Sequence, residues 1–173
     1  MIKIQPYIGE SYSKGGLLNK KILVLGESNY DPNYEVEGYD YSQIVKDNIQ
    51  KCVFESSVAF FTKISKLLLL SEGNNDPSRE RIEEKWKYIA FHNYVQNIFT
   101  GARQRPTERM WSESNTYFLE ILQNLKPEII LVLGIELGAK IKDIPNEFKQ
   151  INIAHPSSGG FSYETWIPKI SET

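Results

Sequence analysis

Chemically versatile side chains follow three short segments of this sequence. Gly26, Glu27 and Asp31 follow residues 21–25, Asn93 follows residues 88–91, and His155 follows residues 150–154. A glycine lets the backbone approach a ligand closely, and an amide can pair with the edge of a planar base through its donor and its acceptor. A histidine can donate a hydrogen bond to a developing anion, and an aromatic ring can stack on a planar group. These residue types predict a ligand-binding site.

Strands must position these side chains, and three apolar runs predict them at residues 21–25, 88–91 and 128–133. A fourth candidate strand covers residues 150–154. The first three do not alternate polar with apolar residues, so both faces of each strand should be covered, as in a parallel sheet. Ligands bind beyond the carboxyl ends of such strands, which is where the versatile side chains stand.

Helical periodicity occupies the sequence between the strands. Apolar residues share one face within residues 58–70 and again within residues 117–125, and Ser78 is a residue type that begins helices. Strands that alternate with helices favour an α/β fold. We therefore expect a three-layer α/β sandwich with a central, mostly parallel, four-stranded sheet flanked by helices. Residues 1–173 should form one domain.

Composition narrows the class of protein. The formal net charge is −2, which is not typical of a strongly basic nucleic-acid binder, although a local basic patch can attract a polyanion at any net charge. The single cysteine, Cys52, excludes an internal disulfide and a multi-cysteine metal centre. Neither a membrane-spanning run nor an apolar signal core is present, so we expect a cytoplasmic protein with no membrane partner. The sequence does not determine the oligomeric state, and a monomer is the favoured expectation.

The order of these segments resembles the uracil-DNA glycosylase superfamily. Residues 26–30 match its Gly-x-x-x-(Tyr or Gly) loop, and Asn93 matches the asparagine that ends its second strand. Residues 126–127 match the Lys-Pro before its third strand, and residues 155–157 match its His-Pro-Ser. The agreement runs from about residue 20 to 163, and residues 105–107 also resemble branches of the superfamily. The cysteines of its iron–sulfur branches are absent.

The resemblance implies an enzyme that flips a base out of DNA and cleaves its N-glycosidic bond without a metal or another cofactor. His155 would stabilise the departing base anion, Asn93 would bind the pyrimidine edge, and Glu27 or Asp31 would position water. Further contacts to the base would come from Gly26, Ser28, Asn29, Tyr30 and Ser157. Contacts to DNA would come from Arg103, Arg105, Ser158, Gly159 and Phe161.

Two details of the implied site stay open in the sequence. The aromatic ring that stacks on the base could be Tyr41, Phe54 or Phe60. Tyr30 would lie against the base and exclude a 5-methyl group, but a core position is the alternative for one of ten tyrosines. Asn93 could instead hold a turn.

A second class of function is a non-catalytic module that keeps the cavity and binds a base, a nucleotide, nucleic acid or a protein. Ser28 stands where some members of the superfamily carry a water-activating residue, and residues 159–160 are glycines where a wedge would stand. A basic groove along Arg103, Arg105 and His155 would favour the enzyme, and an acidic rim would favour the binder. An unrelated nucleotide-binding protein is a weaker alternative, because neither a Gly-x-Gly-x-x-Gly nor a Walker lysine is present.

Overall fold

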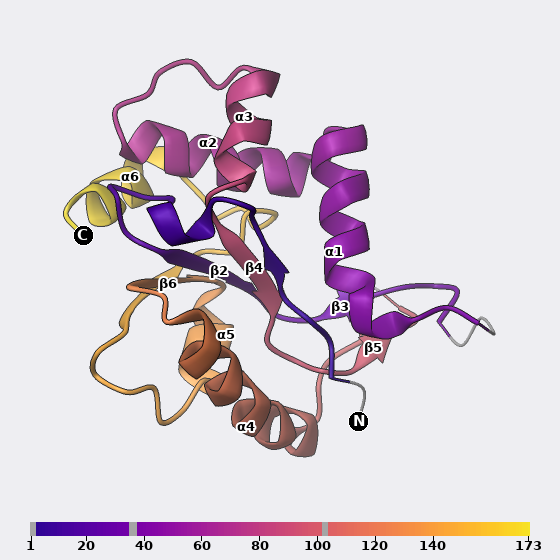
Figure 1. The fold of residues 1–173 in the computed structure, drawn as a ribbon. Helices are drawn as coiled ribbons and strands as arrows, with labels where there is room; N and C mark the ends of the chain where they lie inside the picture. Colours follow the sequence, from indigo (N-terminus) through magenta and orange to yellow (C-terminus); the bar gives the residue numbers. More distant parts are fainter. Residues whose placement is uncertain (1–2, 35–37, 102–103) are drawn as a thin grey trace.

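The computed structural model describes residues 3–34, 38–101 and 104–173. These residues form an α/β fold around a mixed sheet with the strand order β1-β4-β2-β6-β7 (Figure 1). The four predicted strands are present as β2 (Ile22–Gly26), β4 (Ala90–Asn93), β6 (Ile129–Leu133) and β7 (Lys149–Ile153). They run parallel to one another.

The predicted count of four strands is wrong, because the described part of the sheet has a fifth strand. This strand, β1 (Tyr7–Ile8), pairs antiparallel with β4. Two residues are too few to produce a periodic pattern, so only the pairing reveals the strand. A separate small sheet joins β3 (Asn29–Tyr30) to β5 (Ile98–Phe99).

Helices cover both faces of the sheet. One face carries α1 (Ile44–Ile49), α2 (Ala59–Ser71), α3 (Arg79–Trp86) and α6 (Tyr163–Ser171), and the other carries α4 (Glu108–Leu125) and α5 (Ile135–Lys140) (Figure 1). Shorter helical segments are η1 (Tyr12–Lys14), η2 (Tyr41–Gln43) and the π-helix η3 (Gln50–Glu55), which follows α1 directly.

Alternate residues of the central strands pack into two separate hydrophobic cores. Val24 and Leu131 belong to the cluster beneath α1, α2, α3 and α6, whereas Leu23 and Ile130 belong to the cluster beneath α4 and α5. Successive side chains of a strand point to opposite faces. The unbroken apolar runs of β2 and β6 are therefore what a sheet buried on both faces requires.

Local signals set the ends of two helices. Ser78 caps α3, since its side chain accepts a hydrogen bond from the Arg81 N–H. Thr107 caps α4 in the same way and accepts from the Met110 N–H. Lys126 ends α4 in the left-handed conformation at φ 46°, and a proline follows it.

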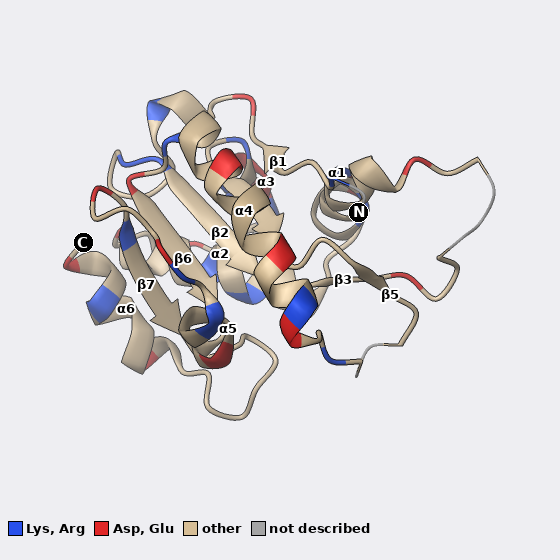
Figure 2. Cartoon of the chain, turned by 90° about the horizontal axis from the view of Figure 1, so that it is seen from below, with Lys and Arg blue, Asp and Glu red and all other residues tan. Residues whose placement is uncertain are grey.

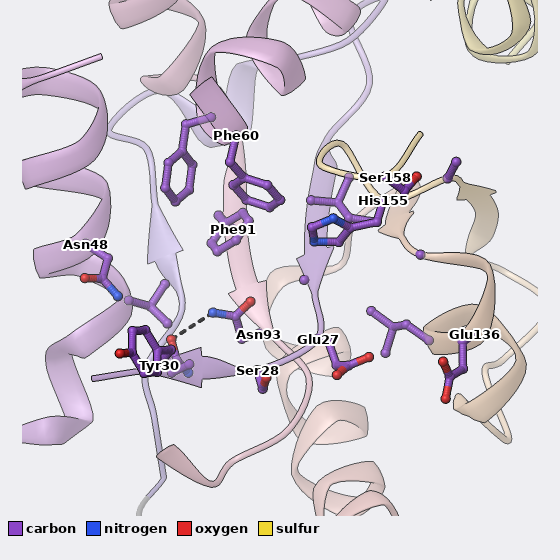
Figure 3. Close-up of a pocket in the computed structure, with 18 of the residues that line it drawn as sticks. Glu27, Ser28, Tyr30, Asn48, Phe60, Phe91, Asn93, Glu136, His155 and Ser158 are labelled. Carbon is purple, nitrogen blue, oxygen red and sulfur yellow. Dashed lines mark hydrogen bonds between the residues drawn. The ribbon is translucent and has the colours of Figure 1, made fainter. Parts of the chain in front are cut away.

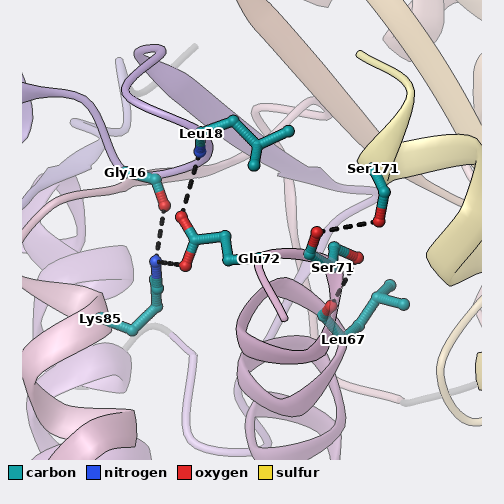
Figure 4. Close-up of polar contacts among 7 residues, drawn as sticks. All are labelled: Gly16, Leu18, Leu67, Ser71, Glu72, Lys85 and Ser171. Carbon is teal, nitrogen blue, oxygen red and sulfur yellow. Dashed lines mark hydrogen bonds and ion pairs between the residues drawn. The ribbon is translucent and has the colours of Figure 1, made fainter. Parts of the chain in front are cut away.

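Polar contacts hold the carboxyl end of α2 in place (Figure 4). Glu72 pairs with Lys85 of α3 and accepts a 3.1 Å hydrogen bond from the Leu18 N–H. The Ser71 carbonyl accepts a 2.8 Å hydrogen bond from the hydroxyl of Ser171 on α6. These contacts fix the axis of α2, whose opposite end reaches the candidate site.

Among the described residues, no helix combines the length and the apolar character needed to cross a membrane.

The strand order locates the expected ligand site. The chain passes from the central strand β2 to β4 on one side, and then returns across the sheet to β6 and β7 on the other. Ligands of such sheets bind beyond the carboxyl ends of the strands, where the direction of winding reverses. Here that position lies between β2 and β6.

Candidate functional site

A cavity of about 760 Å³ lies at the carboxyl ends of the strands (Figure 3). Its walls come from the segments after β2, β4, β6 and β7 and from helices α1 and α2. Most of the residues that the sequence predicts for the site line this cavity, namely Gly26, Glu27, Ser28, Asn29, Tyr30, Asn93, Arg105, His155 and Ser158. Segments up to 132 residues apart in sequence therefore meet in one cavity.

Four expected site residues do not line the cavity. Asp31 accepts a 2.8 Å hydrogen bond from the Asn33 N–H and so stabilises a turn. Phe161 packs edge-on against Tyr163. Ser157 and Gly159 are exposed in the loop after β7. Arg103, expected to contact DNA, lies outside the described residues.

The cavity also contains residues that the sequence did not single out. Of the three aromatic candidates only Phe60 lines the cavity, and Phe61 and Phe91 join it, whereas Phe54 and Tyr41 do not. Asn48 of the short helix α1 points into the cavity near Tyr30 (Figure 3), and Glu136, the second residue of α5, stands at its edge. The position of Glu136 shortly after the glycine that follows β6 could have indicated a site residue from the sequence. Helix α1 has 6 residues, which is too short for a recognisable periodic pattern.

The Asn93 amide is held from two sides. Its Nδ2 donates a 2.8 Å hydrogen bond to Asn29 Oδ1 (Figure 3). Its Oδ1 lies so close to Gly26 that a Cβ there would be 2.2 Å away. Gly26 and Asn93 are register partners on β2 and β4, so the glycine gives the amide the space that it occupies.

A buried polar hub lies behind Asn93. Gln96 accepts a 2.9 Å hydrogen bond from the Ile4 N–H, and its Nε2 donates to the Asn93 carbonyl at 3.2 Å. The same Nε2 lies 2.9 Å from His92 Nε2. Burial lowers the pKa of His92 to about 3, so this ring is neutral at pH 7. The hub fixes the backbone that carries Asn93.

His155 presents one edge of its ring to the cavity. The ring lies 5.3 Å from that of Phe60, centroid to centroid, and the Ser157 N–H donates to His155 Nδ1 at 3.1 Å. Partial desolvation lowers the pKa of His155, which favours the neutral ring at pH 7. Because Nδ1 accepts, the proton of the neutral ring is on Nε2. Ser157 thus orients His155 through its backbone.

Charged residues meet at the mouth of the cavity. Arg105 Nη1 lies 3.6 Å from Glu27 Oε1, and Nη2 of the same guanidinium pairs with Glu136. Burial raises the pKa of Glu27, the guanidinium lowers it, and the second carboxylate raises it. Helix α4 carries the acidic residues Glu108, Glu113 and Glu120 and one basic residue, Arg109, and the described residues form no continuous basic stripe in the view of Figure 2. Two carboxylates beside one cation make this rim acidic.

The described residues contain no group of three or more His, Cys, Asp or Glu side chains placed to hold a metal ion. Comparisons with protein-family models and with curated proteins find no match to this chain. The chemistry of the cavity is therefore what indicates a function.

Proposed function

We propose that this protein is a uracil-DNA glycosylase-like hydrolase that cleaves the N-glycosidic bond of uracil, or of another deaminated or damaged base, in DNA. The observation that carries the proposal is that Asn93, His155 and the aromatic wall at Phe60 face the same cavity. An amide, a neutral histidine and an aromatic face are the groups that bind a planar base and stabilise it as a leaving anion.

Binding of the base uses the fixed amide. A base flipped into the cavity stacks on the aromatic wall of Phe60 and Phe91. The Asn93 amide, with one N–H committed to Asn29, keeps its oxygen and its second N–H for the base edge. A base that offers an N–H beside a carbonyl, as uracil does, pairs with both.

Bond cleavage uses His155 and Glu27. The C1′–N bond breaks and its electron pair passes to the base, whose carbonyl oxygen accepts a hydrogen bond from His155 Nε2–H. Water attacks C1′ and gives a proton to the Glu27 carboxylate, one of the two carboxylates among the described cavity residues. Asp31, the other carboxylate considered for this role, lies outside the cavity.

A second candidate function is binding of a base or nucleotide without catalysis. The acidic rim favours it, because Arg105 is paired with two carboxylates and does not offer an uncompensated charge to a phosphate. The loop after β7 also carries glycines at positions 159 and 160, where an apolar wedge would stand.

Excision of uracil from single- and double-stranded oligonucleotides tests the proposal. The wild-type protein should excise the base, and His155→Ala, Asn93→Ala and Glu27→Gln should lose most of this activity. Asp31→Asn is the matched carboxylate control and should retain it, because its carboxylate serves a turn outside the cavity.

Absence of cleavage with uracil, hypoxanthine, xanthine and hydroxymethyluracil at high protein concentration would refute the hydrolase. Calorimetric titration with free uracil then separates the two candidates. Binding that is lost in Asn93→Ala supports the non-catalytic module, and absence of binding rules out recognition of free uracil by this cavity.

A further inference from the structure

The contacts of Arg105 do not match those of a phosphate-binding residue. Its guanidinium bridges Glu27, from the segment after β2, and Glu136, from the first turn of α5. The Glu27 side chain is 24% exposed, whereas that of Arg105 is 56% exposed. The arginine thus lies over a carboxylate that is largely withdrawn from water.

Moving Arg105 to a DNA phosphate would be unfavourable at this place. Glu27 would lose its cationic partner while still partly buried, and an unpaired charge in such a position is costly. The phosphate would also approach two carboxylates of the same sign. Both effects favour an arginine that stays with its carboxylates.

We propose that Arg105 is a positioning residue that keeps the Glu27 carboxylate ionised and directed along the cavity wall by bridging it to Glu136. This inference rests on the proposed function, in which Glu27 accepts a proton from water. Only an ionised carboxylate can do so, so Arg105 acts on the reaction through Glu27 and not through DNA.

The charges around Glu27 determine which way its pKa moves when Arg105 is removed. Burial is the largest effect and raises the Glu27 pKa, Arg105 lowers it, and Glu136 raises it. His155, from the loop after β7, faces the same cavity, and its lowered pKa favours the uncharged ring at pH 7. Removal of the guanidinium therefore leaves two effects that both raise the pKa of Glu27.

Carbon-13 NMR titration of the Glu27 carboxyl tests the ion pair without any need for activity. In Arg105→Gln the titration midpoint should rise by about one pH unit, and in Arg105→Lys it should stay near the wild-type value, because the charge remains. Arg109→Gln is the matched control and should not move the midpoint, since the ion-pair partner of Arg109 among the described residues is Glu113 on the surface of α4. An unchanged midpoint in Arg105→Gln would overturn the inference.

The pH profile of excision tests the role. In Arg105→Gln the acidic limb of kcat/KM should move to higher pH together with the Glu27 midpoint, and the salt dependence of DNA binding should stay unchanged. A salt dependence reduced by about one counterion, with an unmoved pH profile, would instead assign Arg105 to a phosphate. If the Glu27 midpoint moves but no variant and no wild-type protein excises a base, the ion pair stands and the proposed function fails.

Discussion

Replacing Gly26 with alanine should displace the Asn93 amide. The new Cβ would lie 2.2 Å from Asn93 Oδ1, whereas its next contacts, Asn93 Cγ and Phe91 Cζ, are ordinary at 3.4 Å. The oxygen must therefore retreat by about 1 Å, since real Cβ contacts are rarely closer than 3.0–3.4 Å. The backbone itself tolerates alanine, because Gly26 does not have a positive φ.

The size of the loss in stability follows from the hydrogen bond that this shift breaks. The 2.8 Å bond from Asn93 to Asn29 cannot survive a movement of about 1 Å. Asn29 is 2% exposed, and its Nδ2 already lacks a partner among the described residues. Loss of the bond leaves its Oδ1 unsatisfied as well, at a cost of about 1–3 kcal/mol in the free energy of unfolding.

Urea denaturation followed by tryptophan fluorescence measures this cost. With a slope of about 2 kcal/mol per molar urea, the midpoint of Gly26→Ala should fall by about 0.5–1.5 M. Gly101→Ala is the control and should be neutral, because the nearest described atoms to its Cβ would belong to the flexible Gln104 side chain, at 3.4 Å. Affinity for free uracil should fall at least about tenfold in Gly26→Ala, equivalent to about 1.4 kcal/mol.

A double variant isolates the cause. Gly26→Ala combined with Asn93→Ala should be no less stable than Asn93→Ala alone, since the obstructing amide is then absent. Wild-type stability in Gly26→Ala, or strictly additive losses in the double variant, would refute the packing of Asn93 against Gly26.

Three further predictions concern the buried polar groups. Burial lowers the pKa of His92 from 6.5 to about 3. As the pH falls below 6.5, the unfolded chain binds a proton before the folded protein does, so stability that is present above pH 6.5 is lost. Between pH 7.5 and 5.0 this loss should reach about 2 kcal/mol in the free energy of unfolding. Urea denaturation of His92→Asn at both pH values should show a pH-dependent loss smaller by this amount. Ser65→Ala should lower the free energy of unfolding by about 1–3 kcal/mol, because the buried Trp86 Nε1–H, which donates to Ser65 at 2.8 Å, loses its acceptor. A melt indistinguishable from wild type would contradict this. Lys85→Gln should destabilise by about 1–3 kcal/mol, since Lys85 is 11% exposed and pairs with Glu72. A double-mutant cycle with Glu72→Gln should give a coupling energy well above zero, and a value near zero would mean that the pair contributes nothing.

The sequence by itself determined the main architecture. Apolar runs located β2, β4 and β6 to within about two residues, because a strand buried on both faces needs an unbroken run, and the segment before His155 located the edge strand β7 equally well. The Ser78 cap and the apolar periodicity of α2 and α4 are equally local signals. The carboxyl ends of parallel strands meet at one edge, so the sequence predicts that residues 26–30, Asn93 and His155 lie together, and the structure brings residues of all three segments into one cavity.

Only the tertiary structure decided which side chains complete the cavity. The two-residue strands β1, β3 and β5 exist only through their pairing partners. The choice of Phe60 over Phe54 and the exclusion of Asp31 depend on where a loop turns.

The partners of Arg105 show the reason most clearly. Its carboxylates stand 78 residues before it and 31 residues after it in the chain. No local pattern distinguishes a guanidinium that will meet two carboxylates from one that will meet a phosphate. Such pairing is a property of the packed fold, since burial and neighbouring charge are set by distant segments.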